Sequence, residues 1–356
     1  MRKIARSLLS ICRPSETERQ LLERVGALEA QLAETRREAA WDREFATRRA
    51  ERLEAAIGEL ATLTARLENL HTKSDLYQQE TRALMEKLRV GLGRIEARQT
   101  RDADWDESEF QVFSQFGEDG LLHLLVRLTD IPDRRFVEFG VEDYREANTR
   151  FLLYQGWSGL VMDGREEHIA AIKRDAIYWR FPLKAEKAFI TRENIDELLA
   201  SNGMTGEIGL LSIDIDGNDY WVWEAISVVR PALVVVEYNY RFGPSATVAV
   251  PYRADFTRTS AHPSTIYFGA SLAALCALGT KKGYDFVGCG RNGVNAFFIR
   301  TDLRPPTLPR LQPEDGFRPG TFSEYHDEQG RIVKRSDEEQ QRLLMSLPLV
   351  SVTHHE

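Results

Sequence analysis

Four short apolar runs, each ending in or beside a carboxylate, place the strongest constraint on the fold of this chain. They span residues 135–139, 159–163, 209–214 and 232–237. Near-continuous hydrophobicity over about five residues is typical of strands buried on both faces of a parallel sheet. Helix-forming segments lie around them at 148–154, 166–177, 193–201 and 220–229. This alternation predicts a doubly wound α/β sheet, with its site at the carboxyl ends of the strands.

Beyond residue 251 the pattern closes with a helix and a hairpin. A helix is expected over 271–282, and Gly- and Asn-rich sequence separates two further runs, 283–287 and 295–299, as in a hairpin. A polar, proline-containing tail with a short helix at 337–346 follows. We therefore expect an α/β domain over 105–303 and an appended tail over 304–356.

The first hundred residues have a different character. No proline occurs from Glu16 to Gln99, and Leu, Ala, Glu and Arg, which favour helices, are abundant. Apolar residues recur at heptad spacing in three stretches: Leu21, Val25, Leu28 and Leu32; Leu60, Leu63, Leu67 and Leu70; and Met85, Leu88, Leu92 and Ile95. This pattern predicts a coiled coil over 16–100 that joins copies of the chain into a homo-oligomer.

The charge distribution limits the partners of the α/β domain. Residues 1–100 carry 19 Lys and Arg against 16 Asp and Glu, whereas the remainder carries 28 against 39. Nucleic-acid binding needs clustered basic residues, so this acidic excess argues against such a partner and favours a small or weakly charged substrate. Cys12, Cys276 and Cys289 form no zinc-binding or disulfide pattern, which favours a reducing compartment.

The N-terminal segment 1–15 is basic and contains an apolar stretch of about five residues. A signal peptide needs an apolar region of about 7–15 residues, and a membrane span needs about 20. We therefore expect a cytoplasmic protein with no transmembrane segment. Peripheral contact of this basic segment with a membrane surface is the alternative.

Two strand ends have the features of a cofactor site. The first strand leads into Glu138 and Gly140, and Asn148 stands at the start of the next helical segment. A glycine in such a turn lets a ligand approach the backbone, and a helix N-terminus favours a negative group. Asp163 closes the second strand 23 residues after Gly140, near the spacing of about 20 at which an acidic side chain binds ribose. Gly164 directly after it allows close packing over the strand.

Asp214 and Asp216 follow the 209–214 run, and strand alternation points both side chains to one side. An EF-hand loop is excluded, because it needs Gly at its sixth position and Glu at its twelfth, where this segment has Gly217 fourth and Ala225 twelfth. Two interpretations stay open. The pair holds a divalent cation and a sugar diphosphate, or Asp214 faces a cofactor while Asp216 or Asn218 orients an acceptor hydroxyl.

Glu237 and His262 complete the candidate residues. Glu237 ends the next strand, which in a parallel sheet lies beside the 214–219 loop. Adjacent carboxylates repel one another when ionised, so either a pKa rises or a cation is recruited. His262 falls in an irregular segment expected over the carboxyl edge of the sheet, where it is a candidate base.

At these positions the chain resembles the FkbM-type family of class I methyltransferases, which use S-adenosyl-methionine. The resemblance covers about residues 107–300 and includes neither the coiled coil nor the tail. The matching segments are SQFGED (114–119), VEFGV (137–141), NT (148–149), GLVMD (159–163), IDIDG (213–217), VVE (235–237), and GY (283–284) with NAFF (295–298).

The resemblance implies a Rossmann-like, seven-stranded sheet whose last strand is antiparallel. It also implies that Glu138 and Gly140 line the methionine part of the cofactor, that Asp163 holds the ribose and that Asp214 faces the sulfonium. Many members methylate hydroxyls of sugars or polyketide-like products. The expected function is therefore S-adenosyl-methionine-dependent O-methyl transfer to a hydroxyl of a sugar, a glycan or a similar small acceptor. In many relatives Glu stands in place of Asp216.

Methyl transfer to a hydroxyl is an in-line displacement, in which positioning dominates and a base or metal takes the proton. The candidates for catalysis are Asp216, Asn218, Glu237 and His262. A divalent cation at Asp214 and Asp216 is the alternative. Two other functions stay open: a metal-dependent glycosyltransferase that uses this aspartate pair, and a non-catalytic scaffold whose working part is the coiled coil.

Overall fold

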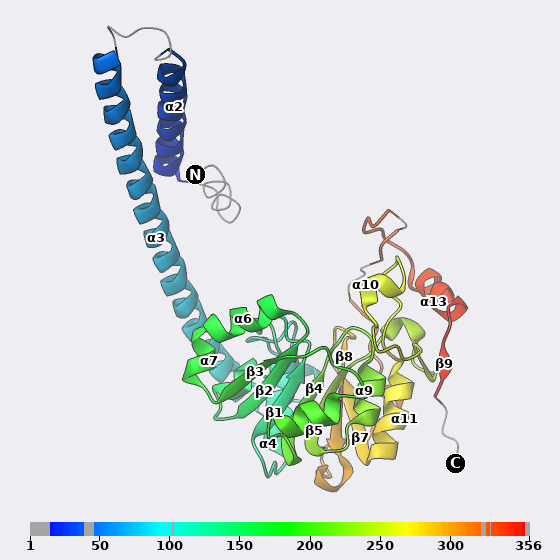
Figure 1. Cartoon of the computed structure of the whole chain (residues 1–356). Coiled ribbons are helices and arrows are strands. Elements are labelled where there is room, and N and C mark those ends of the chain that lie inside the picture. Colours follow the sequence, from blue (N-terminus) through cyan, green and yellow to red (C-terminus); the bar gives the residue numbers. More distant parts are fainter. Residues whose placement is uncertain (1–14, 39–45, 102, 322–324, 328, 353–356) are drawn as a thin grey trace. The chain divides into compact units, whose positions relative to one another are not determined.

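The computed structural model describes residues 15–38, 46–101, 103–321, 325–327 and 329–352 of the chain (Figure 1). It contains two compact units, one within residues 1–88 and one within 89–356. Except for Ser15, the basic segment predicted at 1–15 lies outside the described residues. Among the helices described, none is both long and apolar enough to cross a membrane.

Two helices, α2 (Glu16–Glu38) and α3 (Ala46–Gln99), account for the segment predicted as a coiled coil. Leu28 of α2 is buried with Leu60 and Leu63 of α3, and other members of the first heptad stretch pack against them. The two helices therefore lie side by side (Figure 1). The helical prediction is confirmed, but the first two heptad stretches pack against each other within one chain. A seam of heptads does not determine whether its partner is another copy or another segment of the same chain.

The third heptad stretch remains exposed in this structure. The side chains of Met85, Leu88, Leu92 and Ile95 are between 51% and 61% exposed. On α3, Val90 instead is buried in a cluster with Phe110, Val112 and Phe151. This helix therefore carries an apolar stripe for which the described residues provide no cover.

A seven-stranded sheet forms the core of the second unit, in the order β3-β2-β1-β4-β5-β8-β7. Neighbours among the first five strands are parallel, and β8 is antiparallel to both β5 and β7. The doubly wound fold and the antiparallel last strand are therefore confirmed. The strands are β1 (Arg135–Phe139), β2 (Ser158–Asp163), β3 (Leu183–Lys187), β4 (Gly206–Ile213), β5 (Val229–Glu237), β7 (Tyr284–Cys289) and β8 (Asn295–Arg300).

Helices cover both faces of the sheet, and each face has its own apolar core. One core joins the sheet to α4 (Glu118–Leu128), α5 (Arg150–Leu153), α6 (Glu166–Arg174) and α7 (Ala176–Arg180). The other joins it to α8 (Ile195–Ser201), α9 (Asp219–Ala225) and α11 (Leu272–Lys282). The helix predicted over 220–229 ends earlier, at Ala225, because the backbone becomes extended and β5 begins at Val229.

The polar tail packs against the segment that connects β5 to α11. In this segment lie η2 (Tyr240–Phe242), β6 (Val248–Ala249) and α10 (Arg258–Ala261). Phe242, Phe256 and Phe268 form an apolar cluster with Leu344 of α13 (Asp337–Ser346), and β6 pairs with β9 (Val350–Ser351). The tail therefore supports the segment that forms one wall of the cleft described below. The remaining short elements are η1 (Asp106–Ser108), η3 (Thr301–Leu303) and α12 (Pro313–Gly316).

Candidate active site

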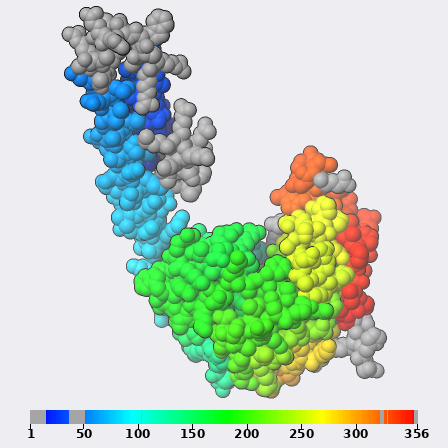
Figure 2. Space-filling model, in the orientation of Figure 1, coloured from blue at the N-terminus to red at the C-terminus, as the bar shows by residue number. Residues whose placement is uncertain are grey.

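A cleft of about 590 Å³ opens at the carboxyl ends of the central strands. Figure 2 shows the hollow between the green part of the second unit and its yellow and orange part. This volume lies within the range of about 300–1,000 Å³ that is common for small-molecule sites. Nine of the predicted site residues line it: Glu138, Gly140, Asn148, Asp163, Gly164, Asp214, Asp216, Asn218 and Glu237.

Glu138, at the end of β1, holds the loop that leads into α5. Its Oε1 accepts a hydrogen bond from the backbone N–H of Asn148 at 2.8 Å, and its Oε2 accepts from the N–H of Thr149 at 3.1 Å. The Asn148 amide in turn donates to the Ser212 hydroxyl. Burial raises the pKa of Glu138 to about 7. This carboxyl therefore fixes the start of α5 on the floor of the cleft.

Asp163, at the end of β2, is tied to the loop after β1. Its Oδ2 accepts the backbone N–H of Glu142 at 2.9 Å, and its Oδ1 accepts that of Arg165 at 2.8 Å. The imidazole Nδ1 of His168 also lies 3.0 Å from Oδ1. Because a carboxylate has about four lone-pair sites, this side chain keeps capacity for a ligand hydroxyl while its orientation is fixed.

The loop after β4 is held by Asp219, the first residue of α9. The buried carboxylate of Asp219 accepts the backbone N–H groups of Ile215 at 2.8 Å and Gly217 at 2.9 Å. Between them, Asp216 has a φ of +55°, a left-handed conformation that Asp tolerates better than most residues. The loop therefore turns back so that Asp219 lies near the end of β4.

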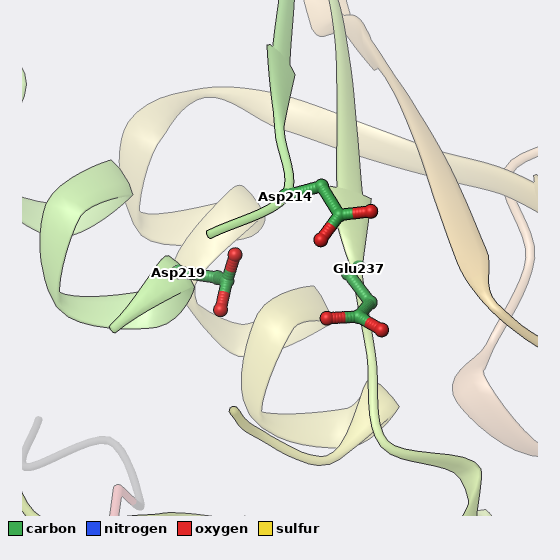
Figure 3. A group of neighbouring side chains, drawn as sticks. All are labelled: Asp214, Asp219 and Glu237. Atoms are coloured by element: carbon green, nitrogen blue, oxygen red, sulfur yellow. The ribbon is translucent and has the colours of Figure 1, made fainter. Parts of the chain in front are cut away.

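Three carboxylates meet where this loop approaches β5. Figure 3 shows Asp214 after β4, Asp219 at the start of α9 and Glu237 at the end of β5, with their carboxylates facing one another. One oxygen of each lies within 4.8 Å of the others. Burial and the neighbouring carboxylates raise the pKa values of Asp214 and Glu237 well above their usual range. Burial also raises the pKa of Asp219 to about 6.

The structure groups Asp214 with Asp219 and Glu237, and leaves Asp216 outside this group. The Asp216 side chain is 58% exposed, and its Oδ1 accepts a hydrogen bond from the Arg258 guanidinium at 2.9 Å. The carboxylates brought within 4.8 Å of Asp214 are therefore those of Asp219 and Glu237, and the pairing of Asp214 with Asp216 as cation ligands stays a prediction. The left-handed turn at Asp216 breaks the strand alternation on which that pairing was based.

His262 does not line the cleft. It follows α10, where its Nδ1 lies 2.7 Å from the hydroxyl of Ser264 and accepts the backbone N–H of the same residue. These contacts indicate that the imidazole stabilises a turn. The cleft wall is formed instead by the neighbouring residues Phe256, Thr257 and Arg258.

Several residues in or beside the cleft were not predicted as site residues. Arg258 brings a guanidinium to the acidic wall, and lies over the Phe268 ring with 4.2 Å between Cζ and the ring centroid. Asn295, at the start of β8, lies opposite Glu237 in the sheet register. Arg258 stands in a segment without periodicity, so no sequence signal marks it. Asn295 begins a predicted strand and Asp219 belongs to the acidic loop after the 209–214 run, so both lie next to residues that the sequence does mark.

The segment 114–119 forms the support behind the cleft. Asp119 is buried, and its Oδ2 accepts the backbone N–H groups of Val112, Phe113 and Ser114, each at 2.7 Å. Glu118 accepts amide hydrogen bonds from Asn295 at 3.1 Å and from Asn292. Asp119 therefore fixes the chain before β1, and Glu118 joins that chain to the β7–β8 hairpin.

No protein-family model matches the sequence, and no curated protein matches it. Among solved structures, the chain is similar to an O-methyltransferase from Bacillus cereus in complex with SAH, at 12% identity and a TM-score of 0.34, over 58% of this chain and 88% of that one. It is also similar to an S-adenosylmethionine-dependent methyltransferase from Clostridium acetobutylicum, at 9% identity and a TM-score of 0.34, over 59% and 97% of the two chains. A third similar structure is a TehB-like SAM-dependent methyltransferase from Corynebacterium glutamicum, at 12% identity and a TM-score of 0.30, over 64% of this chain and 98% of that one. Function is therefore inferred from the residues of the cleft.

Proposed function

We propose that the second unit is an S-adenosyl-methionine-dependent O-methyltransferase that acts on a hydroxyl of a sugar, a glycan or a similar small acceptor. The observation that carries the proposal is the order of side chains along one cleft. Glu138, Gly140 and Asp163 lie at the ends of β1 and β2, and Asp214 and Glu237 follow at the ends of β4 and β5. In a doubly wound sheet, ligands bind at this edge.

The residues of the cleft fit this cofactor chemically. Asp163 offers a fixed carboxylate for the ribose hydroxyls, and Phe189 and Ile190 add apolar surface beside β3 for a flat base. Asp214 and Glu138 add acidic groups where the positive sulfonium is expected. When bound, the cofactor supplies an activated methyl group on that sulfonium. A cleft with an acidic wall attracts a cationic ligand and disfavours an anionic one.

The acceptor side of the cleft contains the groups that hold a hydroxyl and take its proton. The carboxylate of Glu237 is a base for the hydroxyl, and Asp216 is the more exposed carboxylate on the same side. The Asn218 amide donates to the backbone oxygen of Arg253, which leaves its own oxygen for an acceptor hydroxyl. His262 lies outside the cleft and has no role in this mechanism. Positioning of the hydroxyl in line with the methyl group supplies most of the rate.

Calorimetric titration of the full chain with S-adenosyl-homocysteine tests the cofactor assignment. We expect saturable binding at one site per chain, and an Asp163→Ala variant that binds at least about tenfold more weakly, because hydrogen bonds to a charged group contribute about 1.5–3 kcal/mol. A matched control is Asp143→Ala, which removes a half-buried carboxylate that pairs with Arg145. Absence of binding to the wild-type chain, or equal affinity in Asp163→Ala, would contradict the assignment.

The acceptor class requires a separate experiment. Purified chain, S-adenosyl-methionine and a panel of mono- and oligosaccharides are incubated, and mass spectrometry searches for products that gain CH₂. We expect one class of hydroxylated acceptor to be methylated, and Glu237→Gln to abolish the product while it retains cofactor binding. If the cofactor binds and Glu237→Gln methylates at the wild-type rate, Glu237 is not the base.

A further inference from the structure

The two sides of the cleft come from separate segments of the chain, and Tyr252 joins them. Residues 188–190, after β3, line the cofactor side, and residues 256–258, on the segment after β5, line the acceptor side. The Tyr252 hydroxyl donates a hydrogen bond to the carboxylate of Glu193, 59 residues earlier in the chain. The Arg192 guanidinium lies over the Tyr252 ring, with 4.2 Å between Cζ and the ring centroid. These three residues form a latch between the two sides of the cleft.

On the cofactor side, the latch is attached to a fixed turn over residues 188–194. The side-chain oxygen of Asn194 accepts the backbone N–H of Thr191 at 2.8 Å, and its Nδ2 donates to the carbonyl oxygen of Phe189 at 2.9 Å. The residues that contact Tyr252 therefore belong to the same hydrogen-bonded turn as Phe189, which lines the cleft.

On the acceptor side, Tyr252 lies between two anchored residues. The indole Nε1 of Trp221 donates to the carbonyl oxygen of Val250 at 2.8 Å, and the Nδ2 of Asn218 donates to that of Arg253, also at 2.8 Å. Asn218 is the residue that we assign to the acceptor hydroxyl. The position of Asn218 is therefore coupled to that of Tyr252.

The charge states of the latch favour a strong contact. The hydrogen bond from Tyr252 and the neighbouring Arg192 lower the pKa of Glu193 to about 2, whereas burial and the same hydrogen bond raise the pKa of Tyr252. At neutral pH a protonated hydroxyl thus donates to a charged carboxylate, which makes a charge-assisted hydrogen bond. The cation over the aromatic ring adds a second attraction.

We propose that the latch holds the two sides of the cleft together around a bound ligand, with Tyr252 as its positioning residue. This role rests on the proposed function: the latch keeps S-adenosyl-methionine beside Phe189 and sets the distance from the cofactor to Asn218. Closure of a segment over a site commits the ligand to the reaction. Loss of such closure acts mainly on the rate at which the ligand leaves.

Hydrogen–deuterium exchange of the full chain, followed by mass spectrometry, tests the latch without any ligand. Tyr252→Phe removes the hydroxyl and keeps a ring for Arg192. We expect peptides that cover residues 250–258 to exchange at least about threefold faster in this variant than in wild type, because a segment that loses a charge-assisted hydrogen bond opens more often. Peptides of β4 and β5 should exchange at the wild-type rate.

Two variants of the partner carboxylate extend the test. Glu193→Gln keeps an oxygen that accepts the Tyr252 hydroxyl, whereas Glu193→Ala leaves none. We expect Glu193→Gln to exchange nearly as slowly as wild type, and Glu193→Ala to exchange at least as fast as Tyr252→Phe. Glu197→Ala is the matched control, because it removes an exposed carboxylate from the first turn of α8. We expect it to exchange like wild type.

Stopped-flow binding of S-adenosyl-homocysteine tests the positioning role. We expect Tyr252→Phe to raise the dissociation rate constant at least about fivefold and to change the association rate constant by less than about twofold. Glu193→Gln should restore most of the wild-type dissociation rate. The side chains of Arg192 and Glu193 are 48% and 56% exposed, and exposed ion pairs contribute little to stability. Thermal unfolding midpoints should therefore agree among all variants.

Equal exchange of residues 250–258 in wild type and Tyr252→Phe overturns the latch, and so does an equal effect of Glu197→Ala and Glu193→Ala. Faster exchange with an unchanged dissociation rate of S-adenosyl-homocysteine overturns the positioning role. If the wild-type chain does not bind S-adenosyl-homocysteine, the proposed function fails, and the exchange experiment still decides whether the latch joins the two sides of the cleft.

Discussion

Gly140 packs so closely against the end of β4 that a Cβ at this position would lie 1.6 Å from the carbonyl oxygen of Asp214. Gly140 also has a φ of +70°, which favours glycine. The contact joins the turn after β1, on the cofactor side of the cleft, to the residue that begins the acidic wall. The relative position of the two sides of the cleft therefore depends on the absence of a side chain at residue 140.

We predict that Gly140→Ala lowers the free energy of unfolding by about 2–5 kcal/mol, the sum of backbone strain and overpacking. Gly156→Ala is the matched control, because Gly156 has a similar φ of +84° but a Cβ at this residue would meet no atom within 4 Å. The control isolates backbone strain, and we expect it to lower the free energy of unfolding by about 1–2 kcal/mol. Urea denaturation measures both, and S-adenosyl-homocysteine binding should weaken only in Gly140→Ala. Equal losses in the two variants would show that the contact with Asp214 is unimportant.

Glu138 should make stability depend on pH. Its pKa is raised by burial from 4.5 to about 7 in the folded chain, so between these values the folded state holds a proton that the unfolded state has lost. The contribution of Glu138 to the free energy of unfolding is therefore fully present below about pH 4.5. It decreases by about 3 kcal/mol as the pH rises toward 7.

Glu138→Gln removes this ionisation, so the difference in unfolding free energy between wild type and variant isolates the group from the other acidic residues. We predict that wild type loses stability relative to Glu138→Gln as pH rises from about 4.5 to 7. Denaturation curves over this range measure the difference. Parallel pH profiles would mean that Glu138 is ionised throughout or is not perturbed by burial.

The sheet could be predicted from the sequence because buried parallel strands are continuous apolar runs. β3 carries no such run: its sequence LKAEK alternates, and only Leu183 and Ala185 are buried. An edge strand with one solvated face gives a weak signal of this kind. The helical segment shows the same limit. The heptad stretches that contain Leu28 and Leu60 each predict an apolar seam, but they do not show that the two stretches pack against each other within one chain.

The candidate site was predictable where it depends on strand ends. Glu138, Asp163, Asp214 and Glu237 each end a run or follow one, and topology alone brings them to one edge. The position of Asp219 beside Asp214 and Glu237 could not be predicted in this way. It depends on a local turn in which the backbone N–H groups of residues 215 and 217 donate to the Asp219 carboxylate. Contacts that depend on a local turn or on hairpin register leave no periodic trace in the sequence.

Asp119 should stabilise the second unit through the backbone rather than through charge. Its Oδ2 is the acceptor for three consecutive N–H groups, of Val112, Phe113 and Ser114. Asp119→Asn keeps an oxygen at this position, whereas Asp119→Ala leaves these donors buried without an acceptor. Because each unsatisfied donor costs about 1–3 kcal/mol, we predict that Asp119→Ala is at least about 2 kcal/mol less stable than Asp119→Asn. Urea denaturation of the two variants tests this, and equal stability would contradict it.

The exposed stripe on α3 predicts self-association. Met85, Leu88, Leu92 and Ile95 keep heptad spacing and are more than half exposed, whereas the first two heptad stretches pack against each other within the chain. We predict that the wild-type chain is an oligomer by light scattering coupled to size-exclusion chromatography, and that Leu88→Glu combined with Leu92→Glu makes it monomeric, because charges in an apolar seam oppose pairing.

Leu76→Glu is the control for this prediction. Leu76 is 55% exposed on the same helix, and at about 100° per residue it lies roughly 140° around α3 from the centre of the stripe. It should leave the molecular mass unchanged, and S-adenosyl-homocysteine binding should report that all variants retain the fold of the second unit. A monomeric wild-type chain, or an equal effect of Leu76→Glu, would contradict self-association through this stripe.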